Sequence, residues 1–241
     1  MRSSPSSRAD ALARLVAFPF AHRGLHGPGA VENSRAAFET AIAADHGIEL
    51  DVQASRDGDA FVFHDYALAR LTRQSGTLRE LPSAELGRVT LAGTFETIPT
   101  LPAILELIAG RAPLLIEVKS PDRRATALCR SVSNALTRYA GPVGVMSFNP
   151  AVGHYFARHD PDILRGLVVT EADKRNLRGR IERGLALRRA RPDFLAYDIR
   201  DLPSAFARKA GLAVLTWTVR SDAERATAAL YAGQIIYETP R

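Results

Sequence analysis

Eight short apolar runs, separated by longer amphipathic stretches, constrain the fold of this chain more than any other feature. The runs span residues 18–21, 48–52, 114–118, 143–147, 164–169, 194–197, 214–218 and 234–237. Runs of this length and composition are typical of strands that are buried on both faces. Strands that alternate with helices pair in parallel through right-handed crossovers, and eight such units close a (β/α)8 TIM-type barrel. A doubly wound open sheet is the alternative architecture.

The length of 241 residues fits one barrel domain over residues 1–241. The stretch 60–99 is too long for a single connection between the second and third strands, so we expect a small insertion there, on the catalytic face. Four residues follow the last apolar run in the sequence, so no eighth helix is expected after it. We expect a helix over about residues 8–17 to cover part of the exposed barrel instead.

The chain carries a formal net charge of +6, which favours anionic partners such as phosphates. Its densest basic segment, 174–191, is interpreted as a solvated helix face. The segment has no aromatic residue that could stack on a base, so we expect no nucleic-acid partner. No apolar run approaches the ~18–20 residues of a membrane span and no signal peptide is recognisable, which predicts a cytoplasmic protein without stable membrane insertion. No pattern in the sequence indicates an oligomeric state.

Carboxylates occupy alternate positions of the second predicted strand. Glu49 and Asp51 are two residues apart, so both side chains are expected to point into the barrel. Two buried carboxylates repel each other, and a divalent cation removes that conflict. Glu117 in the next predicted strand supplies a third oxygen ligand, and ligand sets made only of oxygen suit Mg²⁺ or Ca²⁺. A salt-bridged pair at the barrel mouth is the alternative interpretation.

Imidazoles and cations also lie at predicted strand ends. His22 and His64 can transfer protons near neutral pH, and Arg23 can bind phosphate oxygens through two hydrogen bonds. Lys119 shares a strand face with Glu117 and supplies a point charge for a phosphate, although a buried Glu–Lys ion pair is an alternative.

Helix capping explains part of the next motif. Asn33 or Ser34 can cap the following helix, whereas Glu32 is not explained by capping.

Taken together, these motifs follow one another in an order that resembles the glycerophosphodiester phosphodiesterase family. The matching series is His22-Arg23-Gly24, Glu32-Asn33, Glu49-x-Asp51, Asp57-Gly58, His64-Asp65, Leu68-x-Arg70-x-Thr72, Ile98-Pro99-Thr100-Leu101, Glu117-x-Lys119, Ser147-Phe148 and Trp217-Thr218-Val219. The series covers nearly the whole chain, and its joint match is specific even though each piece is short.

The resemblance implies a role for each matching residue. The metal, Mg²⁺ or Ca²⁺, would be held by Glu49, Asp51 and Glu117, with His22 and His64 as general acid and base. The residues assigned to phosphate or substrate binding are Arg23, Lys119, Trp217 and Glu32. For Trp217, the alternative is a core tryptophan.

The function implied by the resemblance is metal-dependent hydrolysis of small glycerophosphodiesters to an alcohol and sn-glycerol 3-phosphate. A lysophospholipase D-type hydrolase that acts on lipid phosphodiesters is the alternative enzyme. The mostly polar insertion favours the smaller substrate. A non-enzymatic barrel that binds anionic headgroups or nucleic acid through 174–191 is a third hypothesis, but it leaves the inward carboxylates and the histidines unexplained.

Two positions depart from the family pattern. Arg220 follows Trp217-Thr218-Val219 where the family often has Asn. The C-terminal motif, usually Thr-Asp-x-Pro, reads Tyr237-Glu238-Thr239-Pro240 here. Both departures are expected near the pocket mouth, so they bear on the preference for the leaving group more than on the chemistry.

Overall fold

The computed structural model describes residues 5–120 and 125–239, with side chains from residue 8 onward. Eight parallel strands form a closed barrel, since each pairs with its neighbour and β1 pairs with both β2 and β9. The strands are β1 (Phe20–His22), β2 (Gly47–Ala54), β4 (Leu114–Val118), β5 (Val143–Ser147), β6 (Leu164–Val169), β7 (Phe194–Asp198), β8 (Ala213–Val219) and β9 (Gln234–Tyr237). The predicted (β/α)8 barrel is confirmed, and the open-sheet alternative is wrong.

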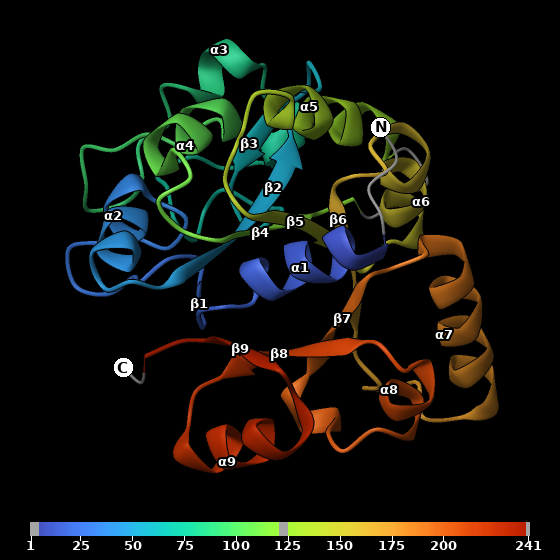
Figure 1. Ribbon diagram of the computed structural model, residues 1–241. Helices are drawn as coiled ribbons and strands as arrows, with labels where there is room; N and C mark the ends of the chain where they lie inside the picture. The colour runs from blue at the N-terminus through green and yellow to red at the C-terminus, as the bar shows by residue number, and fades with distance from the viewer. Residues whose placement is uncertain (1–4, 121–124, 240–241) are drawn as a thin grey trace.

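Helices surround the barrel between successive strands (Figure 1). They are α2 (Arg35–Ala43), α4 (Leu101–Ile108), α5 (Thr126–Leu136), α6 (Pro150–His159), α7 (Leu177–Ala190), α8 (Ala205–Ala210) and α9 (Asp222–Tyr231). Local sequence sets where several of them begin. Ser34, for example, accepts a hydrogen bond from the Ala37 N–H and so caps α2, while Asn149 caps α6 in the same way. None of the helices in the described part of the chain is long and apolar enough to cross a bilayer.

Side-chain alternation along the strands produces two separate cores. On β4, Leu114 and Ile116 point outward into the core beneath the helices, whereas Leu115 points into the barrel. The inner core contains mainly large apolar side chains near the N-terminal ends of the strands, including Phe20 and Phe194. Two residues further along a strand, the same inner face carries polar groups. On β1, for example, Phe20 is followed on this face by His22. The barrel interior is therefore apolar at one end and charged at the other.

The N-terminal helix α1 (Pro5–Leu15) closes the apolar end of the barrel. Leu15 is fully buried there, and Gly144 makes room for it, since a Cβ on Gly144 would lie 2.8 Å from the Leu15 side chain. Arg8 fixes the start of the helix through a 2.6 Å hydrogen bond from its Nε to Asp193, which directly precedes β7. The helix expected over residues 8–17 thus packs on the barrel, and it does so at the N-terminal end.

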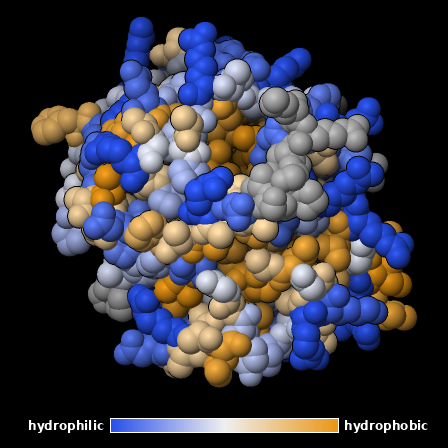
Figure 2. All heavy atoms as spheres, in the orientation of Figure 1, coloured by the Kyte–Doolittle hydropathy of each residue, from blue (hydrophilic) through white to orange (hydrophobic). Residues whose placement is uncertain are grey.

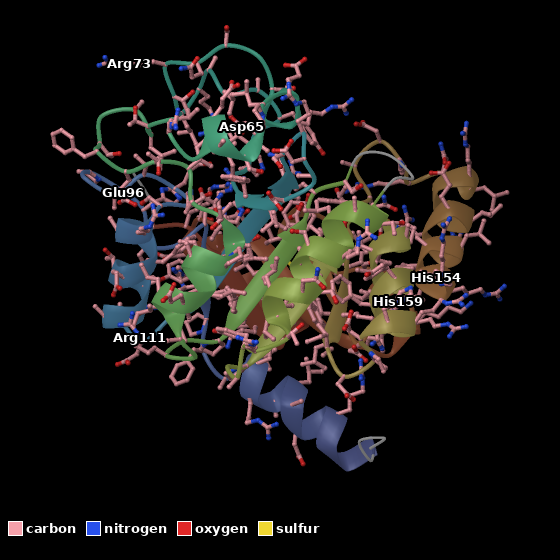
Figure 3. The ribbon with its side chains drawn as sticks, turned by 90° about the horizontal axis from the view of Figure 1, so that it is seen from above. Asp65, Arg73, Glu96, Arg111, His154 and His159 are labelled. Carbon is pink, nitrogen blue, oxygen red and sulfur yellow. The ribbon has the colours of Figure 1, made fainter. Side chains whose placement is uncertain are left out.

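The segment 60–99 lies at the opposite end of the barrel from α1, as the positions of Asp65 and Arg73 in Figure 3 show. It begins with β3 (Ala60–Val62), which pairs antiparallel with the end of β2, and contains η1 (Leu78–Glu80) and α3 (Ser83–Leu86). A small apolar cluster of its own holds it together, with Phe61, Phe63, Leu68, Leu78, Leu86, Val89, Leu91 and Ile98. This packing fixes the position of His64, which directly follows buried Phe63.

Candidate active site

A cavity of about 320 Å³ opens at the C-terminal ends of the strands. Catalytic residues in this fold come from those strand ends. The residues predicted for the site that line this cavity are His22, Arg23, Asp51, His64, Glu117, Lys119 and Trp217. Glu49 and Glu32 lie behind this lining layer and contact residues within it.

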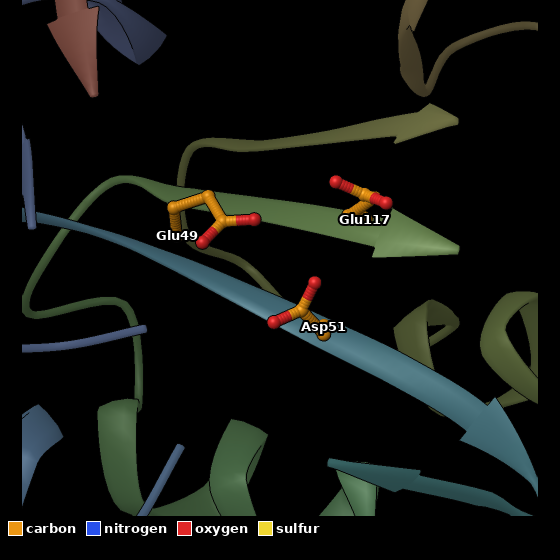
Figure 4. A group of neighbouring side chains, drawn as sticks. All are labelled: Glu49, Asp51 and Glu117. Carbon is orange, nitrogen blue, oxygen red and sulfur yellow. The ribbon is translucent and has the colours of Figure 1, made fainter. Parts of the chain in front are cut away.

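Three carboxylates meet beside the cavity, on the neighbouring strands β2 and β4 (Figure 4). One oxygen from each of Glu49, Asp51 and Glu117 lies within 4.8 Å of the others. Asp51 and Glu117 are direct partners in the strand register, which brings them together. Burial, and then the charges of Asp51 and Glu117, raise the pKa of Glu49 well above its usual value. Burial also raises the pKa of Glu117.

Two cations partly offset this negative charge. Lys119 Nζ lies 2.9 Å from Glu117 Oε1 and 3.3 Å from Asp51 Oδ1. Although burial alone would raise the pKa of Asp51, Lys119 and Arg23 outweigh it and lower that pKa. Arg23 Nε is 3.3 Å from Asp51 Oδ2 but is buried without a hydrogen-bond partner among the described residues. Arg23 also lines the cavity, so its positive charge acts on a ligand bound there.

His22 is held by a carboxylate from the C-terminal end of the chain. Its Nδ1 lies 2.6 Å from Glu238 Oε1, and Arg220 donates from Nε to the other oxygen of Glu238 at 2.7 Å. Burial lowers the pKa of His22, although the bond to Glu238 opposes this. In the neutral imidazole, Nδ1 therefore carries the proton that Glu238 accepts, which leaves Nε2 as the free nitrogen.

His64 is held in the same way from the insertion side. Its Nδ1 lies 2.7 Å from Asp65 Oδ1, and Arg70 forms an ion pair with the same Asp65 carboxylate. The hydrogen bond from Arg70 is the largest of the effects that lower the pKa of Asp65 to about 2, so this carboxylate is ionised at neutral pH. Burial lowers the pKa of His64. Both imidazoles are thus oriented by a carboxylate that is itself paired with an arginine.

Asn33 contributes to the site in a way that the capping interpretation did not foresee. It has a left-handed backbone with φ of 59° and is buried. Its Nδ2 donates to Asp51 Oδ2 at 3.0 Å, and its Oδ1 accepts from the Asp51 backbone N–H at 3.3 Å. Asn tolerates the left-handed region better than most residues, and Ser34 takes the capping role instead. The Glu32-Asn33 pair in the family series was the sequence signal that could have identified Asn33 as a site residue.

Glu32 is buried and binds two arginines. Its oxygens accept from Arg23 at 2.7 Å and from both terminal nitrogens of Arg70, at 2.7 and 2.8 Å. The carboxylate therefore fixes Arg23 at the cavity and links it to the Asp65 pair.

Trp217 lies on the inner face of β8, with its side chain at the cavity. Its indole Nε1 donates to the Ala196 carbonyl at 2.8 Å, so only the ring face is left for a ligand. Phe148 packs edge-on against it, with ring centroids 5.5 Å apart, and is 47% exposed. Phe148 was not predicted as a site residue, although it belongs to the Ser147-Phe148 pair of the family series.

The fold and this site define a (β/α)8-barrel protein with an acidic cluster and two carboxylate-bound imidazoles at the C-terminal ends of its strands, where this fold carries catalytic residues. The model of the glycerophosphoryl diester phosphodiesterase family matches residues 22–234 of the chain. The chain therefore belongs to this family.

Two sequence relatives illustrate the match. A glycerophosphodiester phosphodiesterase of Bacillus altitudinis is 35% identical over 129 residues, which is 51% of this chain and 47% of that protein. The enzyme of the same name from Caldanaerobacter subterraneus is 38% identical over 109 residues, 42% of this chain and 44% of the relative. The matched stretches thus span about half the length of these relatives.

Solved structures share the fold over nearly the whole chain. An Oleispira antarctica phosphodiesterase, solved with its product sn-glycerol 3-phosphate, superposes with a TM-score of 0.80 at 23% identity and covers 95% of this chain and 94% of its own. The glycerophosphodiester phosphodiesterase of Thermotoga maritima gives a TM-score of 0.72 at 23% identity, with coverage of 90% and 92%.

The buried position of Glu32 generates a prediction about stability. Glu32→Gln removes the buried carboxylate that binds the largely buried Arg23 guanidinium, so we expect the free energy of unfolding to fall by about 3 kcal/mol. The matched control is Glu39→Gln, because Glu39 pairs with Arg111 on the exposed surface, where loss of a pair costs about 0–1 kcal/mol. Urea unfolding measures both changes. Equal losses in the two variants would contradict this interpretation.

Proposed function

We propose that this protein is a divalent-metal-dependent phosphodiesterase that hydrolyses glycerophosphodiesters to an alcohol and sn-glycerol 3-phosphate. Family membership supports the activity, as do the names of its sequence relatives. The structural relative from Oleispira antarctica was solved with sn-glycerol 3-phosphate as its product, which supports the same product here. We retain as proposals the single domain over residues 1–241 and the cytoplasmic location.

One observation carries this proposal. Two imidazoles, each with Nδ1 bound by a paired carboxylate, border the same cavity as the acidic cluster. A purely structural role would not require two imidazoles with carboxylate-bound Nδ1 atoms to line one cavity. Cleavage of a phosphodiester needs one group to accept a proton and another to donate one, and two oriented imidazoles meet this need.

The residues present fit a hard divalent cation such as Mg²⁺ or Ca²⁺. The donor set is all oxygen, and burial, together with the charges of Asp51 and Glu117, raises the pKa of Glu49, an effect that a bound cation would oppose. We infer that Glu49, Asp51 and Glu117 hold the ion. Once bound, the ion supplies positive charge that neutralises the phosphoryl oxygens.

The side chains of the chain itself perform the remaining tasks. Arg23, anchored by Glu32, brings its positive charge to the phosphoryl group in the cavity, and Lys119 adds a second positive charge. One imidazole takes a proton from the nucleophile, which is water or the substrate's own 2-hydroxyl. Attack by the 2-hydroxyl gives a cyclic phosphate, which a water molecule then opens to sn-glycerol 3-phosphate. The other protonates the oxygen of the leaving alcohol. Trp217 and Phe148 offer apolar ring surface to the organic part of the substrate.

The lipid-hydrolase alternative is not favoured. The cavity measures about 320 Å³ and is lined mainly by charged side chains, which suits a small polar diester. Asp198, Arg200, Arg220 and Glu224 also line this cavity, in addition to the predicted residues.

Removal of either imidazole tests the activity itself. We expect His22→Ala and His64→Ala each to lower kcat about a hundredfold or more on glycerol-3-phosphocholine, because each loses one proton-transfer step. His154→Ala changes a histidine of α6 that does not line this cavity, so this variant is the control and should keep its activity. Release of sn-glycerol 3-phosphate is the readout. Near-normal turnover by either site variant would refute the assignment.

The metal role has a readout that does not depend on activity. Saturating Mg²⁺ or Ca²⁺ should raise the melting temperature of the wild type by about 5–10 °C, since the ion binds the folded state only. Glu49→Gln and Glu117→Gln should lose this shift, whereas Glu39→Gln should keep it. Chelation by EDTA should abolish turnover, and the same ions should restore it. An unchanged melting temperature in the wild type, together with full activity in chelator, would rule the metal out.

Glu238 is proposed as the residue that orients His22. Glu238→Gln replaces the carboxylate that accepts the Nδ1 proton with an amide, so we expect kcat to fall about tenfold or more while KM changes little. Glu238→Asp keeps the charge and should recover part of kcat. Steady-state kinetics at fixed pH gives both values. If KM alone changes, Glu238 contacts substrate and does not orient the imidazole.

A further inference from the structure

Helix α7 presents apolar side chains on the face that points away from the barrel. Leu177, Ile181 and Leu185 are 70%, 55% and 59% exposed. They are spaced four residues apart, so they form one stripe along the helix. The opposite face of α7 is buried, through Gly179 and Ala190 among others. The exposed stripe is therefore additional to the apolar face that α7 needs for its own packing.

Arginines lie within and beside this stripe. Arg180, Arg188 and Arg189 make no ion pair with any residue in the described part of the chain. Glu182 is the acidic residue of α7, and it is already paired with Lys174 at 3.3 Å and with Arg178 at 3.0 Å. The exposed face of α7 therefore carries uncompensated positive charge next to exposed aliphatic side chains.

A groove of about 810 Å³ runs beside the stripe, between α7 and α8. Basic side chains outnumber the one acidic residue that lines it in the described part of the chain, Glu171, which pairs with Arg183. Arg175 is paired with Asp201, whereas Arg180 and Arg188, like Lys209, add positive charge at the groove. Leu177, Ile181 and Phe206 supply its apolar lining. Figure 2 shows hydrophobic and strongly hydrophilic residues side by side along the edge of the molecule where α7 runs in Figure 1.

We propose that α7, with the α7–α8 groove, is a peripheral docking surface for an anionic phospholipid bilayer. Such a bilayer offers phosphate groups at the level of the arginines and acyl chains at the level of Leu177, Ile181 and Leu185. The helix would lie in the plane of the interface with its long axis parallel to the surface. Binding of this kind is reversible and needs no helix that spans the membrane.

Charge and exposed apolar side chains together favour an anionic bilayer over a second copy of the chain or a nucleic acid. In a symmetric dimer through α7, the same unpaired arginines would face each other, and their like charges would repel. Nucleic acid would match the arginines but would leave the aliphatic stripe uncovered, and α7 has no aromatic side chain to stack on bases. A surface that is both anionic and apolar below its headgroups matches both components of α7.

The test uses the full chain and sedimentation with lipid vesicles. Vesicles of phosphatidylcholine with about one third phosphatidylglycerol are compared with vesicles of phosphatidylcholine alone, at low salt and at 0.5 M NaCl. We expect binding to the anionic vesicles only, weakened at least tenfold by the higher salt because the charges are screened.

Two combined variants test the two components. Leu177→Ser with Ile181→Ser and Leu185→Ser removes the stripe, and Arg180→Gln with Arg188→Gln and Arg189→Gln removes the unpaired charge. Each should weaken vesicle binding at least tenfold. The matched controls change other exposed sites: Phe95→Ser with Leu230→Ser, and Arg73→Gln with Arg79→Gln and Arg88→Gln. The controls should bind as the wild type does, and melting curves check that every variant folds.

Several results would overturn the proposal. They are no sedimentation of the wild type with anionic vesicles, equal binding to both kinds of vesicle, and equal losses in the α7 variants and their controls. Self-association that the stripe variant abolishes, with no vesicle binding, would assign the surface to a second copy of the chain. The readout is independent of hydrolysis, so a failure here leaves the proposed activity untouched.

Discussion

The repulsion among three clustered carboxylates, two of them buried, is the constraint on which the catalytic end of this barrel depends. Glu49, Asp51 and Glu117 bring oxygens within 4.8 Å of one another, where burial strengthens every charge interaction. Lys119 and Arg23 offset part of this charge, while burial and the charges of Asp51 and Glu117 raise the pKa of Glu49. This imbalance supports the cation site that we propose at the three carboxylates.

Around this cluster, hydrogen bonds and ion pairs hold the other side chains of the site in position. Glu32 joins Arg23 to Arg70, so the barrel and the segment 60–99 share one ion-pair network. Glu238 brings the last strand into the same site through His22. Because the anchoring groups come from distant parts of the sequence, the closed barrel must form before the site exists. Activity therefore requires a completely folded barrel.

Strand periodicity made much of this predictable. The eight apolar runs predicted the barrel, and the two-residue spacing of Glu49 and Asp51 predicted that both side chains point into it. The bond between Glu238 and His22 joins residues 216 positions apart, which no local pattern encodes. The bond from Asn33 to Asp51 was not predicted, because Asn33 was already explained as a candidate cap of the following helix. Periodicity thus predicts which way a side chain points, but not which distant side chain it meets.

The most direct test of this account is where a divalent cation binds. Crystals soaked in Mn²⁺, a hard ion with oxygen ligands and a measurable anomalous signal, would reveal the position without reference to activity. We predict a single strong anomalous peak within about 2.5 Å of oxygens from Glu49, Asp51 and Glu117. A barrel that binds the ion elsewhere, or shows no peak at saturating Mn²⁺, would contradict the account.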